Sequence, residues 1–570
     1  MKRREFIKKS ALAGAGITVA SSTVLSAPLI FTKSKTIPNT EMGELIFKPT
    51  FVQNGKGPHL GIIKSFDSVG PAEWDFPSWA FASDTEWDAF YSNIFSTRDG
   101  IKISDANGKD KFGINVRWNV EGFGYIYMTA DNEGEFYALP EKGKHKTLNL
   151  NYELAKSRAS RNRKRVKQFV EEGWEPSRDL KPLIDLTEEY LADASKIEQG
   201  EIKCAQLSQS SLYYSMWAGE KIEVEKSWYD ITKNKFRDKF FIGCDTKGFG
   251  KMDNELFINL FSDLFNYATI THYLPSFQKE ENVYTYGNRD EQFKLLKSRG
   301  ITVEGRPIFW ADECCTPDWL MDKTFPEILK YVERHTREVV SHYGDEMYAW
   351  EIINEAHDFG NIQKLLPDQL VQIAKLIAEV AKDTNPKVHR LINNCCINAD
   401  YVQIWTPKET YKSSQIVTPH QFIKMCYEAG VDFTITGQQL YYQYTNRDLA
   451  DTIRMTERLE KFGKPVQITE IGTTSGPTKE TVASGKYELP NRPYSWHREW
   501  DQELQADWLE QIYTIMYSKP WIEAINWYDF VDPYSFIQNG GLLADTEGNK
   551  KEAYNRLKNL KEKWQLYAKK

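Results

Sequence analysis

The second half of the chain alternates between short apolar runs and longer amphipathic stretches. Apolar runs of strand length recur eight times, and stretches with helical spacing, such as 325–343 and 366–382, separate most of them. Strands that alternate with helices in this way predict a (β/α)8 barrel. No glycine-rich dinucleotide or phosphate loop follows the first run, which disfavours an open sheet. The eight runs are 240–244, 267–271, 301–310, 348–354, 390–394, 433–439, 466–470 and 524–528.

The residues before the barrel show a different periodicity. Between residues 45 and 150, short runs that alternate every second position are broken by Gly, Asn and Asp, which predicts an antiparallel, β-sandwich-like domain. Residues 151–204 are charged and helical and predict a connector, so the barrel domain is expected to span 205–565. Tryptophans 74, 79, 87 and 118 could form a sugar platform, but core packing is the favoured interpretation.

The charge distribution gives no support for a nucleic-acid partner. The net charge is −7 over 570 residues. The basic run 158–167 is followed at once by two glutamates, and we interpret it as a solvated helix face. No segment beyond the N-terminus is apolar for long enough to span a bilayer.

The N-terminus has the pattern of an export signal. Paired arginines precede Phe-Ile-Lys, and a modest apolar stretch then ends in small residues. This pattern resembles a twin-arginine signal, here residues 1–27, with a linker over 28–44. The protein is therefore expected in the periplasm or outside the cell. An uncleaved signal that serves as a membrane anchor is the alternative.

Composition adds two points. Aromatic residues make up 14% of the chain, which fits stacking on sugar rings, although large cores also contain many aromatics. Five of the seven cysteines are Cys314, Cys315, Cys395, Cys396 and Cys426, with two vicinal pairs just after predicted strands. Their spacing matches no zinc pattern, and a twin-arginine substrate folds in a reducing compartment. Buried packing is favoured, and no metal or organic cofactor is expected.

Two of the eight runs end on a glutamate or directly before one. The run 348–354 is followed at once by Glu355, within Trp-Glu-Ile-Ile-Asn-Glu (350–355), and the run 466–470 ends on Glu470. In a (β/α)8 barrel the carboxyl ends of the strands open onto one face, where active sites are built. Two carboxylates on that face are the equipment for cleaving a glycosidic bond, one as acid and the other as nucleophile or base. Two carboxylates that lie close together cannot both stay ionised without cost, so one pKa is expected to rise.

Other residues near these strand ends are candidates for binding the sugar. Asn354 directly precedes the acid and could bond a sugar 2-hydroxyl. Trp310 and Trp527 could wall the site or cap the barrel core, and Gln439 and Tyr441 could contact the nucleophile or be buried structural residues. His272 and Arg306 could supply sugar contacts, with a structural role slightly favoured. Asp529 and Asp532 are weaker acid candidates, and Glu351 is expected to point away.

The barrel resembles glycoside hydrolase family 10, the retaining β-1,4-xylanases, over about residues 205–565. The family's acid/base strand carries Trp-x-x-x-Asn-Glu, here 350–355, and its nucleophile strand ends Ile-Thr-Glu, here 468–470. The resemblance also covers Asn393 on the fifth strand and the segments 265–266, 317–319, 437–439, 541–543 and 551–554. It implies a retaining mechanism with carboxyl groups about 5 Å apart, rather than the 6.5–9.5 Å of inverting enzymes.

The sequence departs from the family pattern around the sugar. Thr271-His272 and Pro275 stand where the family has Glu-Asn and a lysine, and Ala311 stands where it has a histidine after tryptophan. Tyr441 replaces the histidine expected to touch the nucleophile. "Retaining glycosidase" is therefore better supported than "xylanase".

These patterns predict a secreted glycoside hydrolase that cleaves a β-linked polysaccharide or its oligomers, with Glu470 as nucleophile and Glu355 as acid/base. A barrel that binds carbohydrate without turnover is the first alternative. An exported redox protein that uses the vicinal cysteines is the second. Neither the sugar nor the choice between internal and terminal cleavage follows from the sequence.

Overall fold

The computed structural model describes residues 42–50, 80–97, 100–198, 200–233, 237, 239–357, 360–404, 416–443, 446–477 and 494–568. The predicted export signal and most of the predicted linker lie outside these ranges. Among the helices that are described, none combines the length and apolarity needed to cross a membrane.

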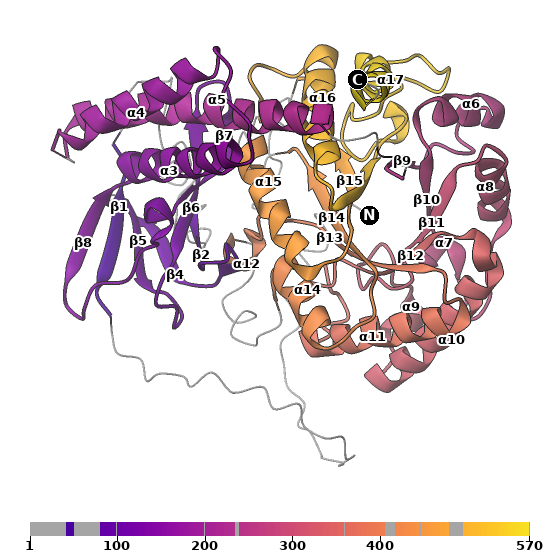
Figure 1. Ribbon diagram of the computed structural model, residues 1–570. Helices are drawn as coiled ribbons and strands as arrows, with labels where there is room; N and C mark the ends of the chain where they lie inside the picture. The colour runs from indigo at the N-terminus through magenta and orange to yellow at the C-terminus, as the bar shows by residue number, and fades with distance from the viewer. Residues whose placement is uncertain are drawn as a thin grey trace, which may run out of the picture. The chain divides into compact units, whose positions relative to one another are not determined.

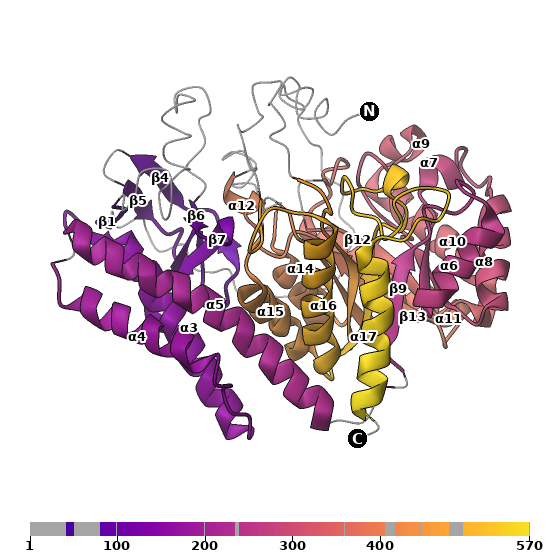
Figure 2. The same ribbon diagram turned by 90° about the horizontal axis from the view of Figure 1, so that it is seen from above.

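The C-terminal part is a closed barrel of eight parallel strands, as predicted (Figures 1 and 2). Each strand overlaps one of the eight apolar runs, because strands covered on both faces need continuous apolar sequence. In order around the barrel, β9 closes the ring between β10 and β16. The strands are β9 (Phe241–Asp245), β10 (Tyr267–Thr271), β11 (Thr302–Arg306), β12 (Ala349–Asn354), β13 (His389–Asn394), β14 (Ile435–Tyr441), β15 (Val466–Gly472) and β16 (Ile522–Trp527).

Helices surround the barrel and begin at recognisable signals. Thr324 and Glu327 form a capping box at the start of α10, and Thr418 with Gln421 does the same for α14, each followed by proline in the first turn. The long helices are α6 (Asn254–Leu264), α8 (Gly287–Ser298), α10 (Phe325–Tyr343), α11 (Pro367–Thr384), α14 (Pro419–Glu428), α15 (Leu449–Glu457), α16 (Gln502–Ser518) and α17 (Glu552–Ala568). Short helices α7 (Leu274–Phe277), α9 (Asp318–Met321) and α12 (Tyr401–Ile404) lie in loops.

The N-terminal strands form two four-stranded sheets around one apolar core. All pairs are antiparallel except β1 with β8, which run parallel, so the predicted antiparallel pairing is wrong for that pair. The core lies between Phe47 and Ile103 on one sheet and Ile114 and Trp118 on the other. One sheet contains β4 (Asn93–Thr97), β5 (Gly100–Asp105), β1 (Glu44–Lys48) and β8 (His145–Asn149), and the other β3 (Ala89–Phe90), β2 (Ala80–Ser83), β6 (Gly113–Val120) and β7 (Gly124–Ala130).

The tryptophans of this region pack rather than face solvent where the structure describes them. Trp118 is fully buried in the core. Trp87 is also buried, and the guanidinium groups of Arg161, Arg447 and Arg454 lie 5.3, 5.6 and 4.4 Å from its ring. Such cation–π contacts hold Trp87 in the interface with the barrel. Trp74 and Trp79 lie outside the described residues.

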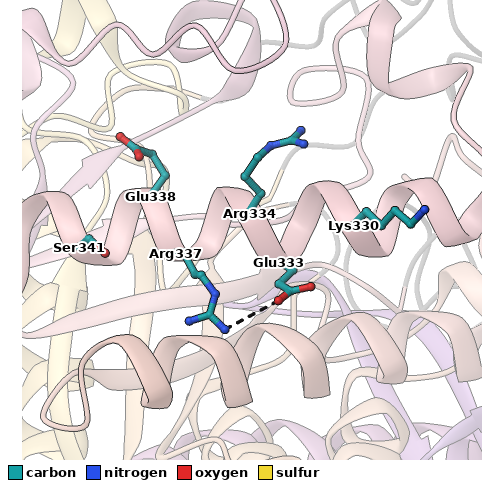
Figure 3. Close-up of a pocket in the computed structure, with 6 residues that line it drawn as sticks. All are labelled: Lys330, Glu333, Arg334, Arg337, Glu338 and Ser341. Atoms are coloured by element: carbon teal, nitrogen blue, oxygen red, sulfur yellow. Dashed lines mark ion pairs between the residues drawn. The ribbon is translucent and has the colours of Figure 1, made fainter.

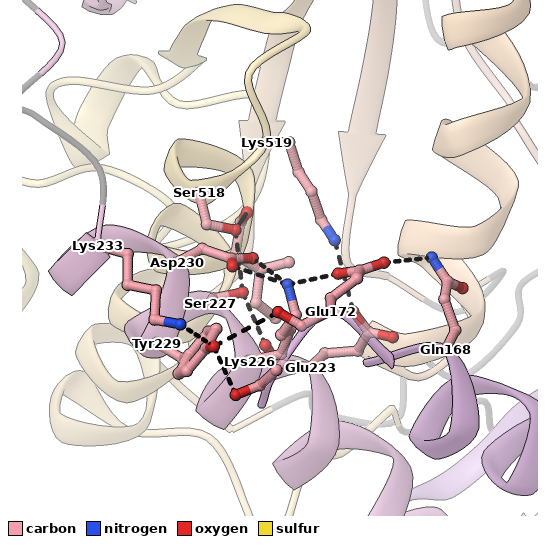
Figure 4. A network of polar contacts seen from close by, with 12 residues as sticks. Gln168, Glu172, Glu223, Lys226, Ser227, Tyr229, Asp230, Lys233, Ser518 and Lys519 are labelled. Carbon is pink, nitrogen blue, oxygen red and sulfur yellow. Dashed lines mark hydrogen bonds and ion pairs between the residues drawn. The ribbon is translucent and has the colours of Figure 1, made fainter. Parts of the chain in front are cut away.

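Three helices connect the sheets to the barrel: α3 (Leu150–Glu171), α4 (Lys181–Ser195) and α5 (Ile202–Lys233). A polar network fastens α5 to its neighbours (Figure 4). Lys226 pairs with Glu172 at 2.8 Å, and Ser518 at the end of α16 donates to Ser227 at 3.1 Å. The helix that precedes β9 is therefore attached to the barrel along its side.

The basic run in α3 is not simply a solvated face, which corrects the sequence interpretation. Arg158 is buried, and its two terminal nitrogens donate hydrogen bonds to the Asp448 carboxylate at 2.9 and 2.6 Å. Arg161 is buried too and pairs with Asp131 and Asp451. Because Asp448 and Asp451 belong to the segment after β14, this run joins the connector to the barrel.

Candidate active site

Glu470 lies on β15 with both carboxylate oxygens occupied. Its Oε1 accepts a hydrogen bond from Arg306 Nη1 at 2.5 Å, and its Oε2 accepts one from the Tyr441 hydroxyl. The side chain is 6% exposed. Burial, with the Glu470 charge next, raises the pKa of Tyr441 well above its ordinary value, so its hydroxyl stays a donor. Arg306 and Tyr441 together fix the orientation of the Glu470 carboxyl group.

Glu355 follows β12 in a strained backbone conformation. Its φ of 43° lies in the left-handed region, which is unfavourable for glutamate and typical of functional sites. Its amide donates to the Asn393 carbonyl at 3.1 Å. Its Oε1 accepts a hydrogen bond from Gln439 Nε2 at 2.9 Å.

Gln439 lies next to both Glu355 and Glu470. In the pairing of β14 with β15, Gln439 stands opposite Glu470, immediately after a register shift between Gln438 and Gln439. The same residue bonds Glu355 through its side chain. The two strand ends, 115 residues apart in sequence, therefore converge across β14, as expected for a barrel mouth.

Arg306, at the end of β11, is the central cation of the site. It is 2% exposed and also donates to Asp245 Oδ2 at 3.0 Å. Burial alone would lower the pKa of Arg306, but the Glu470 and Asp245 carboxylates outweigh burial and raise it well above its ordinary value. Asp245 therefore helps to hold the guanidinium against Glu470.

A layer of buried acids lies below this pair inside the barrel. Glu351 accepts a hydrogen bond from Asn393 Nδ2 at 2.9 Å, and burial raises its pKa well above the ordinary value, with Glu304, Glu470 and Glu355 adding to the rise. Burial also raises the pKa of Glu304 to about 7. Glu351 was expected to point away from the site, but it lies close enough to be influenced by both candidate catalytic charges.

Aromatic rings border the site on the side of β16. Tyr528 follows this strand, and its ring centre is 5.5 Å from that of Tyr441. Phe536 lies 5.3 Å from Tyr441 and 5.7 Å from Tyr528, yet its side chain is 55% exposed. On another side Trp310 is half-buried and 5.7 Å from Tyr273. An exposed ring beside a buried carboxylate is suited to stack on a sugar face.

The family model for glycosyl hydrolase family 10 matches residues 233–560. This range contains the whole barrel. The chain belongs to glycosyl hydrolase family 10. The resemblance seen in the sequence is thereby confirmed.

Several proteins named as xylanases are similar to this chain at low identity. The β-1,4-xylanase of Dictyoglomus thermophilum is 31% identical over 126 residues, which cover 22% of this chain and only 34% of that protein. Endo-1,4-beta-xylanase B of Thermotoga neapolitana is 23% identical over 295 residues, 50% of this chain and 76% of that protein. Among solved structures, native xylanase 10B from Thermotoga maritima is 20% identical and covers 60% of this chain and 99% of its own, with a TM-score of 0.44. Xylanase 10B from Thermotoga petrophila, solved in complex with xylobiose, gives the same identity and TM-score, with 97% of its chain covered.

Two candidate sugar-binding residues, His272 and Trp527, are buried and bonded to other parts of the barrel. His272 is 1% exposed, and its ring nitrogens bond the Ile270 carbonyl and the Tyr343 hydroxyl. Trp527 is fully buried and packs against Trp508 of α16, with its indole nitrogen bonded to the Gly540 carbonyl. Because successive strand residues face opposite sides, it is the neighbour Tyr528 that faces the site.

The remaining candidates divide between contact and support. Asn354 is 4% exposed, and its side-chain oxygen is buried with no hydrogen-bond partner among the described residues. Asn393 is buried between Glu351 and Thr469 and supports the strands from below. Asp529 accepts hydrogen bonds from the backbone amides of residues 536 and 537, and Asp532 forms an ion pair with Lys551 at 3.0 Å. These two acids therefore fix the loop that carries Phe536.

Sequence reasoning missed several residues of the site. Asp245 is the last residue of β9, and the strand-end rule that found Glu355 would have found it if the predicted run had ended one residue later. Arg306 was noted only as a possible sugar contact. Phe536 lies in a loop, where no periodicity marks it.

Two other places in the described part of the molecule have the shape or the ligand spacing of a site. A hollow of about 400 Å³ lies along the outer face of α10 and is lined by charged side chains such as Arg334 and Glu338 (Figure 3). It is on the far side of the helix layer from the strand ends. Glu86, Asp88 and His420 have metal-ligand spacing, but the Asp88 oxygens already accept from His420, Thr418 and Arg458. The adjacent guanidinium disfavours a cation there.

The vicinal cysteines lie after β11 and β13. The sulfur atoms of Cys314 and Cys315 are 3.2 Å apart, and those of Cys395 and Cys396 are 3.0 Å apart. Cys395 Sγ is 3.8 Å from His357 Nε2.

Proposed function

We propose that the protein hydrolyses β-glycosidic bonds of a polysaccharide or its oligomers with retention of configuration. The observation that supports this most directly is the meeting of two glutamates at Gln439, at the mouth of the barrel. Glu470 accepts hydrogen bonds from Arg306 and Tyr441, and Glu355 accepts one from the Gln439 amide. Two carboxyl groups at one barrel mouth are what cleavage of a glycosidic bond requires, one as nucleophile and the other as acid.

In the proposed mechanism Glu470 attacks the anomeric carbon while Glu355 donates a proton to the leaving oxygen. The bond from the anomeric carbon to the leaving oxygen breaks as the bond to Glu470 forms. Glu355, now ionised, takes a proton from water, and that water displaces Glu470. Asn354 is positioned to bond a hydroxyl of the same sugar. No step requires a metal or an organic cofactor.

The substrate is proposed to be xylan-like or a related β-linked polysaccharide. The relatives named above are xylanases, and one of them was solved with xylobiose. The sequence differs from the family pattern at residues 275, 311 and 441, where the family has sugar-site residues, so the sugar itself can differ from xylose. Export through a twin-arginine signal, and hence action outside the cytoplasm, remains part of the proposal.

The mechanism is tested with substitutions of the two carboxylates. Glu470→Gln and Glu355→Gln should each lower kcat by about a thousandfold or more on any glycan that the wild type cleaves. Glu355→Ala with azide should recover activity on an activated aryl glycoside and yield the azide of retained configuration. Glu338→Gln on the outer face of α10 is the control. Full activity of both glutamine variants, or an inverted product, would refute the proposal.

A carbohydrate-binding protein without turnover is the second candidate. The departures at Pro275 and Ala311 favour it, because groups expected to hold the sugar are absent. This candidate predicts that the wild type binds oligosaccharides but releases no reducing ends, even from activated aryl glycosides.

A further inference from the structure

Lys247 is a cation beside the catalytic pair that the mechanism does not use. It lies two residues after Asp245 at the end of β9, on the face of the barrel where Glu355 and Glu470 meet. Its side chain is half-buried, and its ammonium lies 3.5 Å from the ring centre of Tyr528. Arg306 lies 5.2 Å from the same ring.

The ammonium of Lys247 has no oxygen partner among the described residues. The ammonium contacts the Tyr528 ring, and the backbone amide of Lys247 donates a hydrogen bond to Asp245 Oδ1. No carboxylate of the described chain lies within the 4.0 Å that defines an ion pair. The three N–H donors of the ammonium are therefore left for a group that the protein does not supply.

The nearby acids are already occupied by other donors. Asp245 Oδ2 accepts from Arg306 and Thr269, and both oxygens of Glu470 are bound as described above. The two oxygens of Asp529 accept backbone amides at 2.6 and 2.9 Å. None of these acids turns an oxygen toward Lys247 within bonding distance.

Burial without a partner has an electrostatic consequence. Burial lowers the pKa of Lys247, although Asp245 opposes the shift. Burial lowers the pKa of Lys551 as well, but Asp532 and the Asn539 carbonyl accept hydrogen bonds from its ammonium, so that only Lys247 of the two lacks an oxygen partner among the described residues. A partly desolvated ammonium that no protein oxygen compensates is matched best by an anion.

We propose that Lys247 binds an anionic substituent of the substrate, the carboxylate of a uronic acid or a sulfate ester, next to the sugar that Glu470 attacks. This inference rests on the proposed function for the identity of the ligand as a glycan. Tyr528 and Phe536 would contact the sugar rings, while Lys247 would distinguish charged chains from neutral ones.

Binding to full-length protein in a Glu355→Gln background, which blocks turnover, tests the inference. Three probes are compared by calorimetry: a xylo-oligosaccharide bearing glucuronic acid, the same compound after reduction of its carboxyl group, and a sulfated xylo-oligosaccharide. We expect at least one anionic probe to bind roughly tenfold or more tightly than the reduced compound, and Lys247→Met to remove that preference. Whichever anionic probe shows the preference identifies the group as carboxylate or sulfate.

Lys251→Met is the matched control, because it removes the same charge from an exposed lysine in the same loop. It should leave the preference intact. Equal binding of charged and neutral probes, binding of none, or a preference that survives Lys247→Met would each overturn the inference. Loss of turnover in Glu470→Gln tests the proposed hydrolysis separately, so failure of the two ideas can be distinguished.

Discussion

The chemistry of the site depends on how single side chains satisfy one another. Tyr441 stands where the family has a histidine, yet its hydroxyl donates to the Glu470 carboxylate. Burial raises its pKa well above the ordinary value, so the hydroxyl keeps its proton near neutral pH. A tyrosine at this position therefore supplies the contact to Glu470, the proposed nucleophile, with a group that stays protonated.

Replacing Tyr441 should weaken catalysis more than binding. In Tyr441→Phe one oxygen of Glu470 loses its donor, and we expect kcat/KM to fall by about tenfold to a hundredfold. Tyr442→Phe is the control, because that hydroxyl bonds the Ser495 carbonyl instead. Steady-state kinetics on one substrate measures both. Equal rates in Tyr441→Phe and wild type would show that the hydrogen bond has no catalytic role.

At the scale of the strands, the barrel interior contains buried carboxyl groups, and burying such a group costs stability when it is ionised. Glu304 of β11 is fully buried, and Tyr267 donates to its Oε2 at 2.5 Å while Oε1 has no partner among the described residues. Its pKa rises from 4.5 to about 7. The folded protein then holds this proton more tightly than the unfolded chain does, so stability falls as pH rises from about 4.5 to 7.

Glu304→Gln should remove this pH dependence. At pH 8 the variant is expected to be more stable than wild type by about 3 kcal/mol, and at pH 5 by much less, because pH 5 lies near the start of the range over which the wild type loses this stability. Thermal unfolding at both pH values measures the difference. Glu333→Gln on the exposed face of α10 is the control. An equal gain at pH 5 and pH 8 would contradict the assignment.

At the scale of the whole molecule, the N-terminal sheets and the connector are part of the site's support. Arg447, in the segment after β14, donates to Asn115 and Thr129 of the second sheet, each at 2.8 Å. Asp448 is held by Arg158 of α3. This segment follows Tyr441 directly, so the N-terminal region helps to fix the strand end that carries it.

Breaking this link should affect both stability and activity. Arg158→Met leaves Asp448 and Asp451 buried without their shared cation, and we expect a loss of about 3–5 kcal/mol together with lower kcat. Arg163→Met, on the same helix but with exposed partners, should cost less than about 1 kcal/mol. Chemical denaturation and initial rates measure both variants. Similar losses in the two variants would show that the buried ion pair contributes no more to stability and activity than the exposed one.

The sequence by itself determined the eight strands, their order and the two glutamates. Continuous apolar runs specify buried parallel strands because both faces of such a strand must be covered by other parts of the protein. A polar residue that ends such a run lies at the mouth of the barrel. Tertiary structure alone decided which side chains meet there. Strand register turned Trp527 outward and Tyr528 inward, and barrel closure brought Asp245, Arg306 and Glu470 together from the first, third and seventh strands. Contacts between distant strands depend on closure and register, which no local pattern encodes.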